Sequence, residues 1–340
     1  MKLPLLVFSA FAAFAGVASA QSSMTVYGTI DLSAKYVKND GSGRRLSLSQ
    51  DGLNSSQLGF RGGEDLGGGL RAGFVLLAGV NADTGTANSK FWNRRSTVSL
   101  SGNFGEIRLG RDWTPTFWNQ AIFEAFGLQG VGASVATRQL YGGTRMDNAI
   151  GYFLPSNLGG FFGQAMVAAS EGGTALDKGG RYVGGRAGFS SGTYDVALAL
   201  SDQRIDALGG VSQKTYNIGG SYDFGILKLL GYFDRDTLQG RRENMGSIGV
   251  VVPVGVSEVH IGVHRSKMTD ETLRYSNAIT QFALGYVYNL SKRTAVYATV
   301  ARLSNGDHSN NSIATGTSQS APPTLGGKSS GAELGLRHFF

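Results

Sequence analysis

The chain has 340 residues, of which 52 are glycine, 13 tyrosine, 19 phenylalanine and only 6 proline, and its formal net charge is +7. This composition excludes the common kind of disordered chain, which is poor in aromatic residues. The lack of cysteine also excludes a disulfide scaffold. Many strands joined by tight turns fit these numbers.

The first segment, residues 1–20, has the pattern of a secretory signal peptide. One lysine precedes an apolar run over residues 3–17, and the sequence A-S-A directly before Gln21 provides an A-x-A cleavage site. A transmembrane anchor is the alternative, but the run is short and ends in small residues. We therefore predict cleavage before Gln21 and a single domain, residues 21–340, outside the cytoplasm.

Sixteen segments with alternating apolar and polar residues follow in the mature chain. A tilted strand of about 10 residues is long enough to cross a bilayer. The predicted strands cover residues 24–37, 56–62, 70–80, 91–100, 106–112, 145–154, 160–169, 181–190, 193–201, 214–222, 226–235, 245–254, 257–267, 278–288, 294–303 and 330–340.

The connections between these segments alternate between short and long. Tight turns such as S-S-G at 190–192 and D-F-G at 223–225 are separated by longer polar stretches, which include 41–51, 237–243 and 305–329. An up-and-down meander with an even number of strands brings both chain ends to the short-turn side. That is the organisation of an outer-membrane barrel.

A soluble β-sandwich is the alternative that shares this alternation. Several segments, however, carry charge on the face opposite the apolar one, and in residues 56–62 Leu58 and Phe60 oppose Arg61. Such a polar face must meet water, and lipid cannot satisfy an open sheet edge, so the sheet must close. We therefore predict an all-β fold, a 16-stranded antiparallel transmembrane β-barrel whose first strand pairs with its last.

The connection at about 113–144 is the longest one before the final loop. Loops longer than about 12–15 residues are usually functional or disordered. This one contains two tryptophans, three phenylalanines and few charged residues, which would make a poor solvent-facing loop. We predict that this third loop folds into the barrel and narrows it.

Alternation assigns a series of arginines to the lumen. If the apolar face of each strand meets lipid, the arginines of five successive strands form one basic stripe along one wall. For any single arginine, a solvated charge near a strand end is the alternative, and Arg71 is expected near the mouth. The predicted basic residues of the constriction are Arg61, Arg95 and Arg145, followed by Arg108, Arg138 and Lys35. The predicted acidic residues are Glu124, Asp112, Asp147 and Asp31.

These basic residues outnumber the acidic ones near the third loop. Rings of arginine attract anions and lower the barrier to their entry. We therefore predict a channel for the passive diffusion of small hydrophilic solutes and ions that prefers anions. A substrate-selective channel lined by aromatic side chains is the alternative.

Other chemistries find little support in the sequence. His260 and His264 lie four residues apart on one strand, roughly 13 Å at ~3.3 Å per residue, and cannot bind one metal ion. No G-x-S-x-G nucleophile elbow appears, because the matches at 188–192 and 327–331 lie beside predicted strands and not at a strand-to-helix turn, and the basic residues do not cluster into runs. We predict no catalytic residue, no metal site, no cofactor and no nucleic-acid partner.

Several stretches resemble the general porins of Gram-negative bacteria, particularly those of beta-proteobacteria. They include SSMTVYGTIDLSAKY, SSQLGFRGGEDLGGGLRAGF, RRSTVSLSGNFGEIRLGRDWTP, NLSKRTAVYATVARLSNG and GLRHFF. The resemblance implies a trimeric, sixteen-stranded barrel in the outer-membrane bilayer whose third loop constricts the lumen. The C-terminal strand also resembles the signal read by the outer-membrane assembly machinery, with Phe340, His338, Leu336 and Leu334 on one face.

Overall fold

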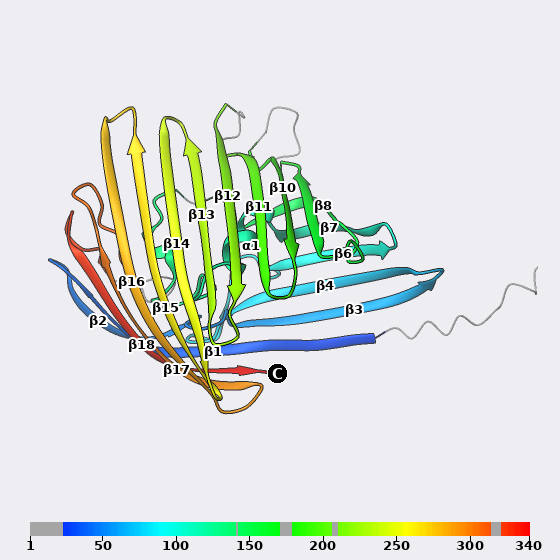
Figure 1. The fold of residues 1–340 in the computed structure, drawn as a ribbon, viewed down its shortest axis with the longest axis horizontal. Coiled ribbons are helices and arrows are strands. Elements are labelled where there is room, and N and C mark those ends of the chain that lie inside the picture. Colours follow the sequence, from blue (N-terminus) through cyan, green and yellow to red (C-terminus); the bar gives the residue numbers. More distant parts are fainter. Residues whose placement is uncertain (1–22, 141, 171–178, 206–209, 314–320) are drawn as a thin grey trace, which may run out of the picture.

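Long antiparallel strands make up most of this computed structural model. Figure 1 shows them side by side, with the C-terminus next to the first strand, β1 (Ser23–Asn39). The predicted signal peptide, residues 1–20, lies outside the part of the chain that the structure describes. That part consists of residues 23–140, 142–170, 179–205, 210–313 and 321–340.

Successive strands pair antiparallel around the barrel. Tight turns join them at one end and longer loops join most of them at the other, as predicted for an up-and-down meander. The strands after β1 are β2 (Gly43–Gln50), β3 (Gln57–Gly67), β4 (Leu70–Asn81), β5 (Thr86–Ala87), β6 (Arg95–Gly102), β7 (Gly105–Trp113), β8 (Arg145–Phe153), β9 (Phe161–Ala168), β10 (Tyr182–Ser190), β11 (Tyr194–Arg204), β12 (Ser212–Asp223), β13 (Lys228–Leu238), β14 (Arg241–Val254), β15 (Ser257–Asp270), β16 (Tyr275–Asn289), β17 (Thr294–Ser304) and β18 (Lys328–Phe339).

The first and last strands close the sheet. β1 pairs with β18, starting with Thr29 opposite Phe339. Phe340 and Gly28 then exchange two backbone hydrogen bonds, each 3.1 Å long. In the described ranges every strand except β2 and the two-residue β5 is bonded to a neighbour on both sides, so the wall has no long open edge in lipid. The predicted pairing of the two chain ends is confirmed.

The barrel wall has sixteen strands, as predicted. β2 and β3 pair one after the other with the two halves of β1, so together they form a single crossing of the wall. β5 is a two-residue ladder that pairs with the end of β4 in the following loop, and β6 takes the next place in the wall.

Two segments that were predicted to be long polar loops belong to strands, so that prediction was wrong. Most of residues 41–51 forms β2. Within residues 237–243, β13 and β14 continue up to a tight turn at Gln239 and Gly240, whose φ angles are 45° and 76°. Two successive positive φ angles are typical of a type I′ hairpin turn. The ends of β13 and β14 carry polar residues on both faces, which hides them in the sequence. In β2, Leu46 and Leu48 keep an apolar outer face, but the arginines and serines around them resemble a polar loop.

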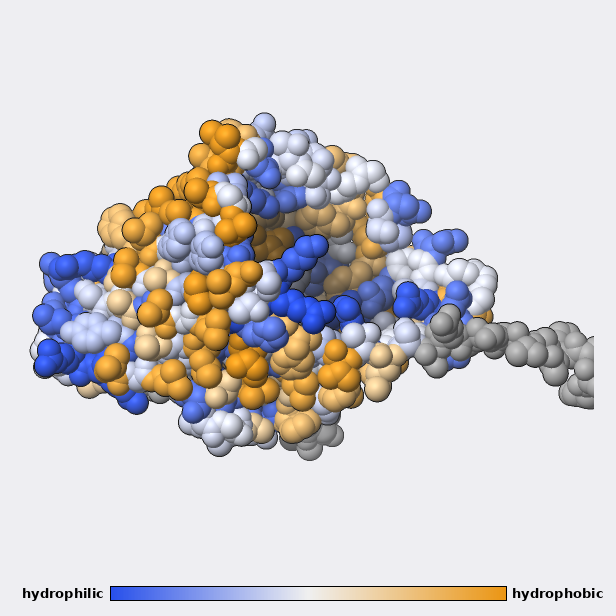
Figure 2. Space-filling model, turned by 90° about the horizontal axis from the view of Figure 1, so that it is seen from below, coloured by the Kyte–Doolittle hydropathy of each residue, from blue (hydrophilic) through white to orange (hydrophobic). Residues whose placement is uncertain are grey.

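Alternate residues of each strand face the outside and the lumen. In β12, Tyr216 and Ile218 are 50% and 46% exposed on the outside, while Asn217 between them is 5% exposed and faces inward. Figure 2 shows hydrophobic residues over much of the outer surface and hydrophilic ones around the hollow and at the left end. This is the distribution expected of a barrel surrounded by lipid.

Residues 51–56, between β2 and β3, turn into the lumen. The carboxylate of Asp31 accepts hydrogen bonds from the amides of Leu53 and Asn54 at 2.9 and 2.6 Å, and Tyr297 donates its hydroxyl to the same group. Asp31 is 0% exposed. This predicted acidic residue of the constriction therefore lies beneath the bend and holds it in place.

Within the described ranges, helical structure is confined to one connection, which contains α1 (Pro115–Ile122) and the 3-10 helix η1 (Ser134–Thr137). In the same ranges, neither the length nor the hydropathy of any helix suffices to span a membrane. Both helices precede β8, in the segment predicted to enter the barrel.

Candidate pore constriction

Residues 114–144, here called the lumen loop, connect β7 to β8. At the start of the loop, the hydroxyl oxygen of Thr114 accepts the amide of Phe117 at 3.3 Å and caps α1. Pro115 follows in the first turn, where its missing N–H has no helical partner to lose. The same threonine hydroxyl donates to the carbonyl of Gly143 at 2.8 Å, which joins the two ends of the loop.

Amide side chains hold α1 against the inner wall. Asn119 donates from Nδ2 to Oδ1 of Asn217 at 2.8 Å and to the carbonyl of Ala197 at 3.2 Å. Arg186 of β10 donates from Nε to Oδ1 of Asn119 at 2.7 Å. The helix is therefore bonded to β10, β11 and β12 rather than standing free in the lumen.

Arg138 anchors the lumen loop to the wall through two carboxylates. Its guanidinium contacts the carboxylates of Asp234 and Asp236 on β13, at 2.7 Å for the second, and donates to Oε1 of Gln120 at 2.7 Å. Burial by itself lowers the pKa of Arg138, but the two carboxylates outweigh burial and raise that pKa. The arginine is therefore a permanently charged clamp between the loop and the wall.

The rest of the lumen loop is bonded to the strands near the C-terminus. The carboxylate of Glu243 on β14 accepts the amides of Gln139 and Leu140 at 2.9 and 2.6 Å. The carboxylate of Glu333 on β18 accepts the amide of Val131 at 3.0 Å. Two further lumen-facing carboxylates are thus occupied by the backbone of the loop.

Glu124 organises the lumen loop from within. Its carboxylate accepts the amides of Phe126, Leu128 and Ser134 at 2.9, 2.8 and 3.0 Å. The imidazole Nε2 of His264 lies 3.6 Å from Oε1. Glu124 is 4% exposed, so this predicted acidic residue of the constriction lies inside the loop and away from open water.

Lys35, predicted to be a basic residue of the constriction, lies under the same loop. It is 1% exposed, and its Nζ is 3.7 Å from Oε2 of Glu333. The lysine therefore compensates a buried carboxylate and does not present its charge to the lumen.

The opposite wall, formed by β3, β4, β6, β7 and β8, carries the basic stripe. Arg108 donates from Nη1 to Oδ2 of Asp112 at 2.7 Å, and from Nε and Nη2 to Glu106 at 3.1 and 2.9 Å. The Nε of Arg95 lies 3.4 Å from Oδ1 of the same Asp112. The structure thus brings three predicted residues together, Arg95, Arg108 and Asp112.

Aromatic rings support the remaining arginines of this wall. The guanidinium carbons of Arg145 and Arg95 lie 5.3 and 6.0 Å from the centroid of the Trp113 ring. Arg61, which is exposed, lies over the ring of Tyr27 at 5.2 Å. Cation–π contacts of this kind orient a guanidinium without neutralising its charge.

Asp147 is separated from the basic stripe by an irregularity in β8. Asn148 has a φ of 50°, and the register between β7 and β8 shifts at this level. Asp147 therefore forms ion pairs with Arg111 and Lys90, at 2.7 and 2.5 Å, at the long-loop end of the barrel. The alternation used for the prediction does not hold across this bulge.

Several residues that shape the lumen were missed by sequence reasoning. Alternation alone could have placed such residues inside. Asp234 and Asp236, for example, lie on the face opposite the apolar Phe233. Their loop partners could not have been found in this way. The missed residues are Glu106, Arg186, Asp234, Asp236, Glu243 and Glu333.

A cavity of about 250 Å³ opens on the basic wall. It combines guanidinium groups with aromatic rings and is lined by Arg95, Arg108, Asp112, Trp113, Trp118, Phe153 and Gln164. A closed barrel with an apolar outer face, a charged interior and an inward-folded loop defines a membrane channel.

Comparison with known proteins identifies the kind of channel. Residues 8–308 match the Gram-negative porin family. The chain is 38% identical to outer membrane porin protein 32 of Delftia acidovorans, with 100% of both chains covered. It is 29% identical to an outer membrane porin protein of Bordetella pertussis, with 88% of this chain and 93% of the other covered.

Solved structures agree with this assignment. An anion-selective porin from Comamonas acidovorans superposes with a TM-score of 0.83 at 35% identity, covering 94% of this chain and 100% of that one. The trimer form of OmpT from Vibrio cholerae shares the fold at 12% identity, with a TM-score of 0.66 and coverage of 94% and 99%. The chain belongs to the Gram-negative porin family and is a porin of the outer membrane, which confirms the predicted fold, family and location.

Proposed function

We propose that this porin prefers anions and that its constriction lies between the basic stripe and the lumen loop. The observation that carries the proposal is the unequal exposure of charge. The wall carboxylates Asp234, Asp236, Glu243 and Glu333 are 1%, 1%, 1% and 4% exposed. Arg61 is exposed, and Arg95 keeps 17% of its side-chain surface accessible. Glu106 keeps 28% of its side-chain surface accessible but is bound by Arg108. Water in the lumen therefore faces mainly positive charge, which lowers the entry barrier for anions.

The kinship with an anion-selective porin at 35% identity supports the same preference. In the described part of the chain, Arg95 and Arg108 lie beside Asp112 and Glu106, and Arg61 and Arg145 lie on the same wall. We assign the constriction to Arg61, Arg95, Arg108 and Arg145 with Asp112 as their acidic partner. No catalytic step is part of the proposal.

Replacing Arg95 by alanine should lower the anion preference and raise the conductance. A unit charge 4–8 Å from a passing ion contributes about 0.5–1 kcal/mol in water, with opposite sign for anions and cations, so the anion-to-cation permeability ratio should fall by a factor of roughly 5–30. The reversal potential of single channels in a salt gradient measures this ratio. Lys214→Ala, on the outer face of β12, is the matched control and should leave the ratio unchanged. A clear cation preference of the unsubstituted protein would contradict the proposal.

A substrate-selective channel is the second candidate, favoured by the cavity in which Trp113, Trp118 and Phe153 accompany the arginines. Flat aromatic rings beside a guanidinium suit an organic anion better than chloride. Conductance that saturates with salt, or a current blocked by an aromatic carboxylate, would favour this candidate. Conductance that rises in proportion to salt, without block, favours the general porin.

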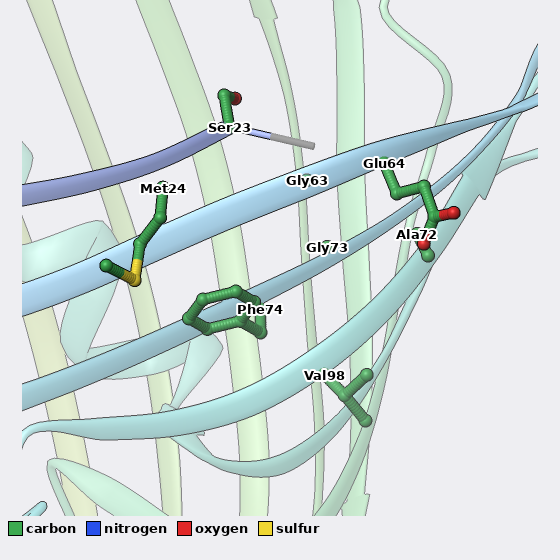
Figure 3. A pocket seen from close by; sticks show the side chains of 8 residues that line it. All are labelled: Ser23, Met24, Gly63, Glu64, Ala72, Gly73, Phe74 and Val98. Carbon is green, nitrogen blue, oxygen red and sulfur yellow. The ribbon is translucent and has the colours of Figure 1, made fainter. Parts of the chain in front are cut away.

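We infer that the mature chain, from Gln21 onward, assembles as a homotrimer. The outer faces of β1, β3, β4 and β6 suit a subunit contact, because a groove of about 310 Å³ lies there among large apolar and very small side chains. Met24, Phe74 and Val98 are 67%, 38% and 54% exposed along it, beside Gly63 and Gly73 (Figure 3). Cross-linking of a cysteine introduced at Met24 would test the contact.

A further inference from the structure

Arg186 of β10 is an arginine of the lumen that lies outside the basic stripe. Its neighbour Ala187 is exposed on the outer face, so alternation places Arg186 inside, where it is half-buried. In the register of the sheet it is opposite Gln164 of β9, which is opposite Phe153 of β8. Phe153 and Gln164 line the cavity on the basic wall. Arg186 therefore borders this cavity on the side away from Arg108.

Neutral groups hold the guanidinium of Arg186 in place. Its Nε donates to Oδ1 of Asn119 on α1 at 2.7 Å, and its guanidinium carbon lies 4.6 Å from the centroid of the Phe162 ring. The amide nitrogen of Asn119 is itself bonded to β11 and β12. The position of the charge is thus fixed by an amide and a ring, and neither of them cancels it.

The charge of Arg186 has no counter-ion close by. In the ranges that the structure describes, no carboxylate forms an ion pair with it, and its two Nη groups donate to no acceptor of the chain. Asp195 of β11 acts on it only at longer range, and the carboxylate of Asp195 accepts the hydroxyl of Ser221 at 3.2 Å. The N–H groups of both Nη atoms therefore remain available to an ion in the lumen.

The arginines across the cavity are in a different state. Arg108 donates to both Glu106 and Asp112, and Arg95 shares Asp112. The two positive charges of this group are balanced by its two negative ones. Four adjacent strands, β7 to β10, separate Arg108 from Arg186 by about 14 Å at ~4.8 Å per gap. Arg186 thus adds an uncompensated positive charge beside a group whose formal charge is zero.

We infer that Arg186 is a specificity-determining residue of the pore, which attracts an anion in the cavity and repels a cation on the same path. The inference rests on the proposed anion preference and adds a determinant outside the constriction assigned above. Attraction of this kind needs no change of pore width, because the guanidinium acts through its charge.

Replacing Arg186 by glutamine should lower the anion-to-cation permeability ratio by a factor of roughly 4–10, for ions that pass about 6–10 Å from the guanidinium. Reversal potentials of single channels measure the ratio, in a salt gradient kept below about 0.1 M, where the Debye length exceeds about 10 Å. Arg235→Gln is the matched control. Arg235 also donates from Nε to an asparagine Oδ1 at 2.7 Å, that of Asn244, but it is exposed on the outer face of β13. Its replacement should leave the ratio unchanged.

Two further variants separate the charge of Arg186 from its contact with α1. Arg186→Lys keeps the charge and should keep most of the anion preference. Gln164→Glu places a carboxylate opposite Arg186 and leaves the bond to Asn119 intact, so it should lower the ratio much as Arg186→Gln does. Conductance in about 1 M salt, where the Debye length is about 3 Å, should match that of the unsubstituted protein in all three variants.

The outcomes distinguish this inference from the proposed function. If the unsubstituted protein prefers anions and Arg186→Gln leaves the ratio unchanged, the inference is wrong and the proposed function stands. An equal fall of the ratio in Arg186→Lys and Arg186→Gln, or a raised conductance of Arg186→Gln in about 1 M salt, would also overturn it, because the contact with α1 would then be the cause. Cation preference of the unsubstituted protein would instead contradict the proposed function itself.

Discussion

Replacing Arg138 by methionine should widen the pore and shift its selectivity towards cations. Arg138 is the joint partner of Asp234 and Asp236 and holds Gln120 of α1 as well. Without it, two carboxylates that are 1% exposed lose their compensating charge. Removing one partner of a buried ion pair typically costs about 3–5 kcal/mol.

Release of part of the lumen loop costs less free energy than unfolding of the barrel, because contacts to the inner wall hold the loop in place. Release of the segment around Arg138 would let water reach both aspartates. Two negative charges would then face the lumen opposite the basic stripe. Single-channel conductance and reversal potential would report the two changes separately.

Compensating substitutions provide the control. In the triple variant Arg138→Met/Asp234→Asn/Asp236→Asn no charge is left unpaired, so anion preference should return towards that of the unsubstituted protein. Arg138→Lys keeps the charge but loses the planar guanidinium, and an intermediate conductance is expected. An unchanged conductance and reversal potential in the methionine variant would refute the anchoring role.

Deleting Phe340 should sharply reduce the amount of folded barrel in the outer membrane and leave the conductance of refolded channels nearly unchanged. Phe340 closes the barrel through its two backbone hydrogen bonds with Gly28, and its ring lies against that glycine. A Cβ at position 28 would come within 2.3 Å of the Phe340 ring. The terminal ring therefore occupies space that only glycine leaves open.

The deletion also distinguishes a signal that is any terminal phenylalanine from a signal that is the outward face of the last strand. It leaves the chain ending in Phe339, which pairs with the inward-facing Thr29 and stacks with Arg337 at 4.2 Å. Leu334, Leu336, His338 and Phe340 are exposed on the outer face of β18. If the assembly machinery reads this outward face, a terminal phenylalanine on the wrong face will not replace Phe340.

Phe339→Ala is the matched control, because it removes a neighbouring ring of the same type from the other face. It should assemble much like the unsubstituted protein, whereas Gly28→Val should resemble the deletion by displacing the Phe340 ring. Resistance of the folded barrel to unheated detergent on gels measures assembly in membranes. Normal assembly of the deletion variant would show that the outward face of β18 is not read.

The sixteen-stranded barrel could be predicted from the sequence because each of its strands shows the alternation of apolar and polar residues within a short segment. A strand between lipid and water must alternate, and the period of two is visible in segments such as residues 278–288 and 294–303. Closure follows from the need to pair every backbone group in lipid. Prediction was wrong for residues 237–243, where the strands lose the apolar face that reveals them, and for residues 41–51, where the arginines and serines around Leu46 and Leu48 resemble a polar loop.

The sequence by itself therefore determined the class of fold, the pairing of the two chain ends and the inward entry of the lumen loop. Alternation also placed Arg61, Arg95 and Arg108 on one inner wall. Only the tertiary structure decided which charges stay accessible. Arg138 and Asp236 are 98 residues apart, and no local pattern relates them. Burial removes Asp31 beneath the bend at 51–56, Lys35 beneath the lumen loop and Glu124 within that loop from the lumen. The free energy of each charge depends on its partners in space and on its access to water.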